Sequence, residues 1–221
     1  MILEVDNIEL NFGNKKILSA IYIKAEKGKI TGILGRNGCG KSCLLEIIFG
    51  NLKPKYQNIR INTKKVKPNL YSLKNIAYLP QYSLIPKDLK LATLFKLFEQ
   101  DWKAFIMVFD SFKVYKKSRL KNLSSGEIRV VETYLILNSK KDIILLDEPF
   151  SFIAPIYVEQ FKIMLHQIKK EKIILITDHF YNDILELSDT IYFLKNGYSK
   201  LITTTEELEK EGYLINDKSA S

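Results

Sequence analysis

The sequence is poor in the residues and segments that mark secreted, membrane-spanning and zinc-binding proteins. Its 221 residues include two cysteines, two histidines and one tryptophan. Cys39 and Cys43 lie four residues apart, which provides neither a disulfide framework nor the second ligand cluster of a zinc site. No apolar run approaches the roughly 18 to 20 residues of a membrane span, and residues 1–6 lack the basic and apolar regions of a secretory signal. We therefore expect a cytoplasmic protein.

The composition is that of a globular domain with a basic surface. Apolar residues make up 46% of the chain and charged residues 27%, so the chain is long enough and apolar enough to bury a substantial core. The formal net charge of +9 would suit nucleic acid or an anionic membrane surface, yet the lysines are scattered along the chain. A solvated lysine-rich surface explains this pattern better, and we expect no nucleic-acid partner.

One stretch of eight residues carries a phosphate-binding pattern. The pattern G-x-x-x-x-G-K-[ST] is matched without exception by Gly35, Arg36, Asn37, Gly38, Cys39, Gly40, Lys41 and Ser42. A short apolar strand, 29–35, precedes it, and a helix begins at about Cys43. Glycines at such a turn let backbone N–H groups face inward beside the positive end of the helix, which makes an anion cradle. Lys41 would reach the β- and γ-phosphates and the Ser42 hydroxyl would bind Mg²⁺.

A buried strand, 142–147, ends in the carboxylate pair Asp147 and Glu148. An apolar strand that delivers two acids to its end is costly unless the acids serve a cation or a water molecule. The arrangement is typical of a metal-facing aspartate followed by a general base. The serines at 124 and 125 precede an amphipathic helix that runs to about Asn138, whose first N–H groups form a second predicted anion site.

The remaining pattern predicts an α/β protein with an antiparallel β subdomain at its N-terminus and a small helical insertion. Residues 3–12 and 17–24 alternate apolar and polar side chains on either side of a turn, as paired strands do. Residues 82–121 have helical spacing and many aromatic residues, which we interpret as an inserted helical lobe within a core of 1–81 and 122–221. Further expected strands are 59–61, 75–79, 172–177, 190–195 and 198–202, and further expected helices are 155–170 and 205–211.

Taken together, four stretches resemble the nucleotide-binding subunit of an ATP-binding cassette (ABC) ATPase, a P-loop NTPase, over nearly the whole chain. They are the phosphate loop (the Walker A motif), Gln81 after a strand, the signature-like 123–127 (Leu-Ser-Ser-Gly-Glu), and Asp147-Glu148 followed by His179. The resemblance implies one ABC domain spanning 1–221, which binds ATP with Mg²⁺ and hydrolyses it. It also implies a second cassette as partner, because two such subunits enclose ATP head to tail.

Site residues follow from this resemblance one by one. Phe12 would stack on adenine, although core packing also explains an aromatic residue at the end of a strand. Gln81 would contact Mg²⁺ and the attacking water, Glu148 would polarise that water, and His179 would contact the γ-phosphate. The catalytic set is Glu148, His179, Gln81 and Lys41. The nucleotide-binding set is Phe12, Gly35, Asn37, Gly38, Cys39, Gly40, Lys41, Ser42, Cys43, Ser124 and Gly126, of which Ser124 and Gly126 would serve the partner's ATP. The Mg²⁺ set is Ser42, Gln81 and Asp147.

Three positions depart from the family pattern. Ser125 replaces the second signature glycine, Ala154 stands where an aspartate is usual, and Val130 stands where an arginine is common. The catalytic residues remain, so we expect an active ATPase. We also expect Cys39 to be a reactive thiolate, because it lies beside Lys41 at a helix N-terminus.

Two further classes of function remain beside the leading one. The leading function is the ATPase subunit of a membrane transporter, with two cassettes, identical or different, docked on membrane-spanning subunits at the inner face of the cell membrane. A soluble single-cassette ABC ATPase, for example in iron-sulfur cluster assembly, is the main alternative. Ser125 and Ala154 motivate the third class, a subunit that binds nucleotide without turnover.

Overall fold

The computed structural model describes residues 1–66, 74–83 and 85–213. The predicted tail after Asn216 lies outside these residues. The strands are β1 (Ile2–Phe12), β2 (Lys15–Glu26), β3 (Ile30–Gly35), β4 (Tyr56–Ile61), β5 (Lys64–Lys65), β6 (Ile76–Leu79), β7 (Ile143–Asp147), β8 (Ile173–Thr177), β9 (Thr190–Lys195) and β10 (Tyr198–Ile202). The α-helices are α1 (Lys41–Phe49), α2 (Leu91–Leu97), α3 (Trp102–Val108), α4 (Ser125–Leu137), α5 (Pro155–Ile168), α6 (Tyr181–Leu187) and α7 (Thr205–Lys210), and the 3₁₀ turns are η2 (Asp110–Tyr115) and η3 (Leu120–Asn122).

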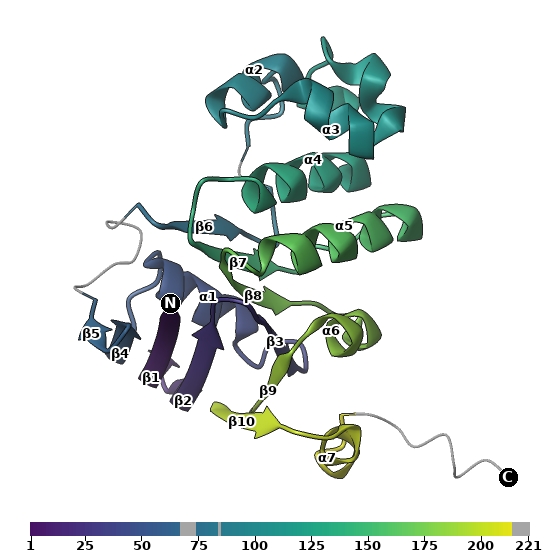
Figure 1. Ribbon diagram of the computed structural model, residues 1–221. Helices are drawn as coiled ribbons and strands as arrows, with labels where there is room; N and C mark the ends of the chain where they lie inside the picture. The colour runs from purple at the N-terminus through teal and green to yellow at the C-terminus, as the bar shows by residue number, and fades with distance from the viewer. Residues whose placement is uncertain (67–73, 84, 214–221) are drawn as a thin grey trace, which may run out of the picture.

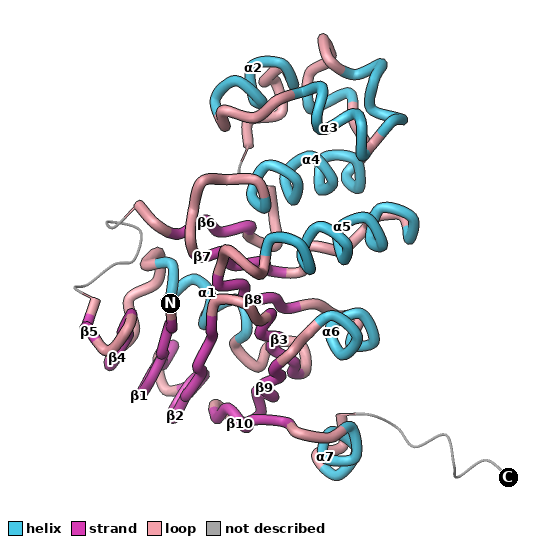
Figure 2. The backbone as a smooth tube through the Cα atoms, viewed as in Figure 1, coloured by secondary structure: helices cyan, strands magenta, loops and turns pink. Residues whose placement is uncertain are grey.

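The described strands form one curled sheet in the order β5-β4-β1-β2-β10-β9-β3-β8-β7-β6 (Figures 1 and 2). β1 pairs antiparallel with β2 and with β4, which confirms the predicted N-terminal strand pair. β3, β6, β7, β8 and β9 run parallel. The antiparallel and parallel parts meet where Tyr198 of β10 lies opposite Ala20 of β2. The α/β architecture expected from the sequence is therefore confirmed.

Alternation along the parallel strands divides the core into two layers. Along β7, Ile144 and Leu146 join the apolar cluster beneath α4, α5 and α6, whereas Ile143 and Leu145 join the cluster that contains α1 and the N-terminal strands. Side chains on a strand change face at each residue, so the last residue, Asp147, lies on the α1 side. The fold thereby aims this carboxylate towards the helix that follows the phosphate loop.

The segment between β6 and α4 is helical throughout its regular elements, as its sequence predicted. Most of its aromatic side chains are buried: Phe105 and Phe112 are almost fully covered and Trp102 is 7% exposed, whereas Tyr82 is exposed. The Phe105 ring lies 4.9 Å from that of Tyr134 on α4. These buried aromatic residues therefore pack in a core, which is a more frequent role for such residues than a surface for a partner. Its treatment as a separate lobe, 82–121, remains a prediction.

Several boundaries and two elements differ from the sequence-based expectation. β2 begins at Lys15 and not at Ile17, because the hairpin pairs Phe12 directly with Lys15. The two-residue strand β5 and the helix α6 were not predicted. Both are short, and short elements carry too few periods of alternation to be recognised in a sequence.

Candidate functional site

The phosphate loop connects β3 to α1. Gly40 has a left-handed conformation, with φ of 106°, which a glycine adopts without strain. No side chain caps the helix that starts at Lys41, and its first turn carries no acidic residue. The Lys41 side chain is buried, and its Nζ donates to the carbonyl oxygens of Gly35 at 2.7 Å and Arg36 at 3.4 Å. The start of α1 is therefore a positive helix end beside an ammonium group that the loop holds in place.

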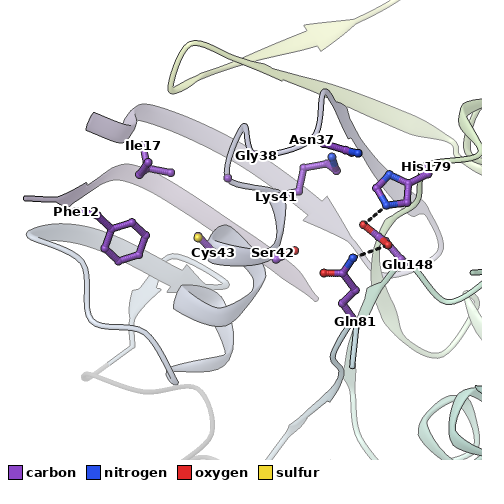
Figure 3. A pocket seen from close by; sticks show the side chains of 11 residues that line it. Phe12, Ile17, Asn37, Gly38, Lys41, Ser42, Cys43, Gln81, Glu148 and His179 are labelled. Carbon is purple, nitrogen blue, oxygen red and sulfur yellow. Dashed lines mark hydrogen bonds and ion pairs between the residues drawn. The ribbon is translucent and has the colours of Figure 1, made fainter. Parts of the chain in front are cut away.

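A cavity of about 360 Å³ lies in front of this loop (Figure 3). It brings together residues from five distant parts of the chain. Its lining consists of Phe12, Ile17, Asn37, Gly38, Gly40, Lys41, Ser42, Cys43, Gln81, Glu148 and His179. Ten of these eleven were predicted for nucleotide binding or catalysis, and Ile17 is the one that was not. The volume and the mixture of apolar and charged groups suit a nucleotide's phosphates and the adjoining sugar.

Glu148 is the centre of the polar end of the cavity. Its Oε2 accepts a hydrogen bond from Nε2 of Gln81 at 2.9 Å, and its Oε1 lies 2.7 Å from Nε2 of His179 (Figure 3). The side chain is 5% exposed, and the backbone has a left-handed φ of 52° that non-glycine residues rarely adopt. Such local strain is characteristic of functional sites. The structure thus joins three predicted catalytic side chains at one carboxylate.

Asp147 lies one residue earlier, is buried, and is not among the residues that line the cavity. Its Oδ1 accepts from Oγ1 of Thr177 at 2.7 Å, and its Oδ2 accepts from the hydroxyl of Tyr78 at 3.3 Å. Burial and the Asp147 carboxylate together raise the pKa of Tyr78, which keeps this phenol protonated as a donor. Tyr78 and Thr177 lie on the α1 side of strands that flank β7, so strand alternation explains why all three side chains meet.

Arg129 is a residue of this region that the sequence reasoning missed. Its guanidinium is buried and donates to the carbonyl oxygens of Pro80 at 2.6 Å, Glu148 at 2.9 Å, and Asp147. The Arg129 side chain on α4 thus supports the backbone just before Gln81 and the backbone of Asp147 and Glu148. From the sequence we noted only that Val130 stands where an arginine is common in the family, and we assigned no role to the arginine one position earlier. The sequence did carry a signal for this role, because Arg129 is a cation between two apolar residues of α4, Ile128 and Val130.

The signature-like residues lie outside the cavity. Ser124 caps α4 as expected, with its Oγ accepting from the N–H of Glu127 at 3.2 Å while the Glu127 carboxylate accepts from the N–H of Ser124 at 2.7 Å. Gly126 lies so close to the next segment that a Cβ atom there would be 2.3 Å from the carbonyl oxygen of Phe152. The predicted nucleotide contacts of Ser124 and Gly126 are therefore not made with the cavity of their own chain.

Gly35 and Cys39 also do not line this cavity. Cys39 lines a second cavity beside Arg36, and burial raises the pKa of its thiol more than the nearby Lys41 lowers it. The predicted reactive thiolate at Cys39 is therefore wrong, because desolvation outweighs the attraction of the ammonium group. Cys43 does line the cavity of Figure 3, and burial likewise raises its pKa.

Phe12 lies at the apolar end of the same cavity, next to Ile17 (Figure 3). It is 53% exposed, although it ends a strand whose other apolar residues are largely buried. An exposed aromatic ring at a cavity mouth is available for stacking on a planar ligand. The position favours the stacking interpretation over the packing one.

Comparison with known proteins agrees with this geometry. The protein-family model for the ABC transporter family matches residues 18–151. An uncharacterized ABC transporter ATP-binding protein of Methanocaldococcus jannaschii is 29% identical over 231 residues, which cover 98% of this chain and 84% of that protein. A probable ABC transporter ATP-binding/permease protein of Haemophilus influenzae is 30% identical over 212 residues, which cover 88% of this chain but 38% of that protein.

A solved structure of the ATP-binding subunit of an ABC transporter has the same fold, with a TM-score of 0.83 at 20% identity over 96% of this chain and 94% of that one. The family match extends over more than half of the sequence, from β2 past the pair of acids at the end of β7. The fold, the cavity and the family match point to the same activity. The chain belongs to the ABC transporter family, as an ATP-binding subunit that hydrolyses ATP.

Proposed function

We propose that this protein binds Mg-ATP in the cavity of Figure 3 and powers a membrane transporter through ATP-driven association of two cassettes. One observation carries the proposal. The cavity gathers Lys41, Gln81, Glu148 and His179, while the signature-like Ser124 lies elsewhere on the same chain. A site assembled this way has its phosphate-binding and catalytic groups but lacks a second set of donors for the γ-phosphate. A second cassette supplies that set.

The residues around the loop fit a magnesium ion. Mg²⁺ prefers oxygen ligands, keeps several waters and uses few carboxylates when phosphates are present. Ser42 contributes a hydroxyl, and Gln81 has its amide oxygen available since its Nε2 is used by Glu148. Asp147, whose carboxylate accepts hydrogen bonds from Thr177 and Tyr78, would accept hydrogen bonds from water molecules bound to the ion. When bound, the ion would neutralise charge on the β- and γ-phosphates.

The protein side chains then have separate tasks. Lys41 binds the phosphates after exchanging its bonds to the loop carbonyls, and Phe12 stacks on the adenine. Glu148 accepts a proton from the attacking water at an oxygen that Gln81 or His179 now occupies. Gln81 orients that water, and His179 turns its Nε2 towards the γ-phosphate. Each task needs a group that already faces the cavity.

The transport partner is proposed from the surface and from a relative. A cavity of about 630 Å³ lies beside the signature-like segment and is bordered by Gln81, Tyr82, Lys121 and Phe152. A membrane subunit that docks there would contact Gln81 and the two residues that follow it. The Haemophilus relative carries ATP-binding and permease parts in one protein. Within the described residues, no helix has the length and hydropathy to cross a membrane. We therefore propose peripheral attachment to separate membrane-spanning subunits at the inner face of the cell membrane.

Two measurements test the proposal. Light scattering of the Glu148→Gln variant should show a dimer with Mg-ATP and a monomer with ADP or without nucleotide. A pull-down of tagged protein from detergent-solubilised native membranes should recover a multi-span membrane protein, with increased ATP hydrolysis in the recovered complex. Recovery of soluble cluster-assembly or ribosomal proteins alone would contradict the transport role. A protein that stays monomeric with ATP would contradict the two-cassette mechanism.

A further inference from the structure

A second cavity, of about 240 Å³, lies against the other side of the phosphate loop. It shares no lining residue with the cavity of Figure 3. The loop contributes Arg36 and Cys39, β9 contributes Phe193, and the far wall is Glu211, directly after α7. The loop therefore has nucleotide-facing residues on one side and a contact with the C-terminal part of the chain on the other.

Residues 211–213, which we call the C-terminal clamp, contact the first two residues of the phosphate loop. Nη2 of Arg36 donates to the carbonyl oxygen of Gly212 at 2.7 Å. The phenol of Tyr213 lies near the backbone of Gly35, which lowers the phenol's pKa, while burial raises that pKa more strongly. The conformation of the loop where it leaves β3 is thereby fixed by contacts from a segment more than 170 residues away.

The C-terminal clamp is itself held firmly. The ring of Tyr213 packs against Phe193 of β9 at a centroid distance of 5.1 Å and against Tyr181, two residues after His179, at 6.2 Å. Lys195 donates to the carbonyl oxygen of Glu211 at 2.9 Å and to its carboxylate at 3.0 Å. Leu208 of α7, fully buried, anchors the helix that precedes the clamp. The clamp therefore connects β9, the start of α6 and the phosphate loop.

The contacts of Lys41 show what the C-terminal clamp does for the loop. Lys41 donates to the carbonyl oxygens of Gly35 and Arg36, the same two residues that the clamp holds. A site binds more tightly when the groups that contact its ligand are held in place before binding. Loss of the clamp would loosen the path of the loop, whose backbone N–H groups face the phosphates even after Lys41 has exchanged its bonds to the loop carbonyls.

We propose that the C-terminal clamp positions the phosphate loop for ATP, with Arg36 and Tyr213 as positioning residues. The inference rests on the proposed role of the loop in binding the ATP phosphates. The clamp lies outside the residues matched by the family model, 18–151. The catalytic residues within the matched range do not by themselves imply it.

The test compares Tyr213→Phe and Tyr213→Ala with Tyr198→Phe and Tyr198→Ala, since Tyr198 is an exposed tyrosine on β10. Calorimetry gives the Kd for ATP, and steady-state assays give KM and kcat. Because a polar contact with a loop contributes on the order of 1 kcal/mol, removal of the Tyr213 hydroxyl in Tyr213→Phe should raise Kd and KM about three- to tenfold with kcat within about twofold. Tyr213→Ala should have a larger effect, and the Tyr198 variants should match the parent.

A second measurement uses the reciprocity of coupled sites. If the C-terminal clamp stabilises the ATP-binding form of the loop, ATP must stabilise the clamp by the same factor. Amide exchange at Gly212 and Tyr213 should therefore slow when ATP is added to the parent protein. If amide exchange did not change, or if the Tyr213 variants had the parent's Kd and KM, the positioning role of the clamp would be overturned. The proposed function would not be affected. A parent protein that binds no ATP would overturn the proposed function and the clamp together.

Discussion

Nε2 of His179 lies 2.7 Å from Oε1 of Glu148. Gln81 occupies the other carboxylate oxygen of Glu148 at 2.9 Å. Both oxygens are therefore bonded to groups that would face the γ-phosphate or its attacking water once ATP is bound. A carboxylate in this position, next to the phosphate loop, is placed to accept a proton from that water.

Replacement of this carboxylate by an amide should separate binding from hydrolysis. Glu148→Gln keeps the shape of the side chain but removes the proton acceptor, so we expect hydrolysis to fall by about 10² to 10⁴. The Kd for ATP should stay within about twofold, because Lys41 and the loop are unchanged. Phosphate release and calorimetry measure the two quantities. Glu171→Gln, an exposed acid-to-amide change, is the control. Hydrolysis at the parent rate would refute the general-base role.

Arg129 offers a prediction about stability as well as activity. Arg129→Met leaves the carbonyl oxygens of Pro80, Asp147 and Glu148 without their guanidinium donor. We expect a loss of about 2 to 4 kcal/mol in the free energy of unfolding and a reduced kcat, since the chain at Glu148 loses its support. Urea denaturation measures the first effect. Arg119→Met, at an exposed arginine, should change stability by less than about 0.5 kcal/mol. Equal stabilities for the two variants would contradict the proposal that Arg129 supports the backbone at Pro80, Asp147 and Glu148.

The sequence predicted most of the strands and the residues that follow them, because each signal is local. Residues within a few positions of each feature are enough to predict the phosphate loop, the apolar strand before Asp147 and the serine cap of α4. The order of the parallel strands is not local, so the sequence did not reveal that Tyr78 and Thr177 flank Asp147. The contact between Arg36 and Gly212 also joins segments far apart in the chain and has no local pattern.

The cysteines give a test of pH dependence. Burial raises the pKa of both thiols, so at neutral pH each should react with maleimide more slowly than free cysteine does. The rate should rise about tenfold per pH unit until the raised pKa is reached, because only the thiolate reacts. Single variants Cys39→Ser and Cys43→Ser isolate the two reactions in a thiol-labelling assay.

ATP should distinguish the two thiols. Cys43 lines the cavity of Figure 3, so ATP should slow its labelling strongly, whereas Cys39 lines the other cavity and should be less protected. The Cys43→Ser protein reports Cys39 alone. If that protein reacted faster than free cysteine at pH 7, desolvation would not be the main influence on the pKa of the Cys39 thiol.

Ala154 gives a prediction in which a substitution should stabilise the protein. It occupies the N-cap position of α5 with an extended backbone, and it has no side chain to accept from the first N–H groups. Pro155 already provides a favoured first helical residue. Ala154→Asp restores both the cap and the residue usual in the family, and it adds a negative charge at the positive end of the helix.

We expect Ala154→Asp to add about 1 kcal/mol to the free energy of unfolding, which corresponds to a rise of about 2 to 4 °C in Tm for a domain of this size. Ala154→Asn is the matched variant, since it caps without the charge and should give a similar gain. Thermal unfolding measured by circular dichroism compares the three proteins. A lower Tm for both variants would show that the backbone at 154 does not present its side chain to α5. A gain for Ala154→Asp alone would assign the effect to the helix dipole, because the amide and the carboxylate cap equally well but differ in charge.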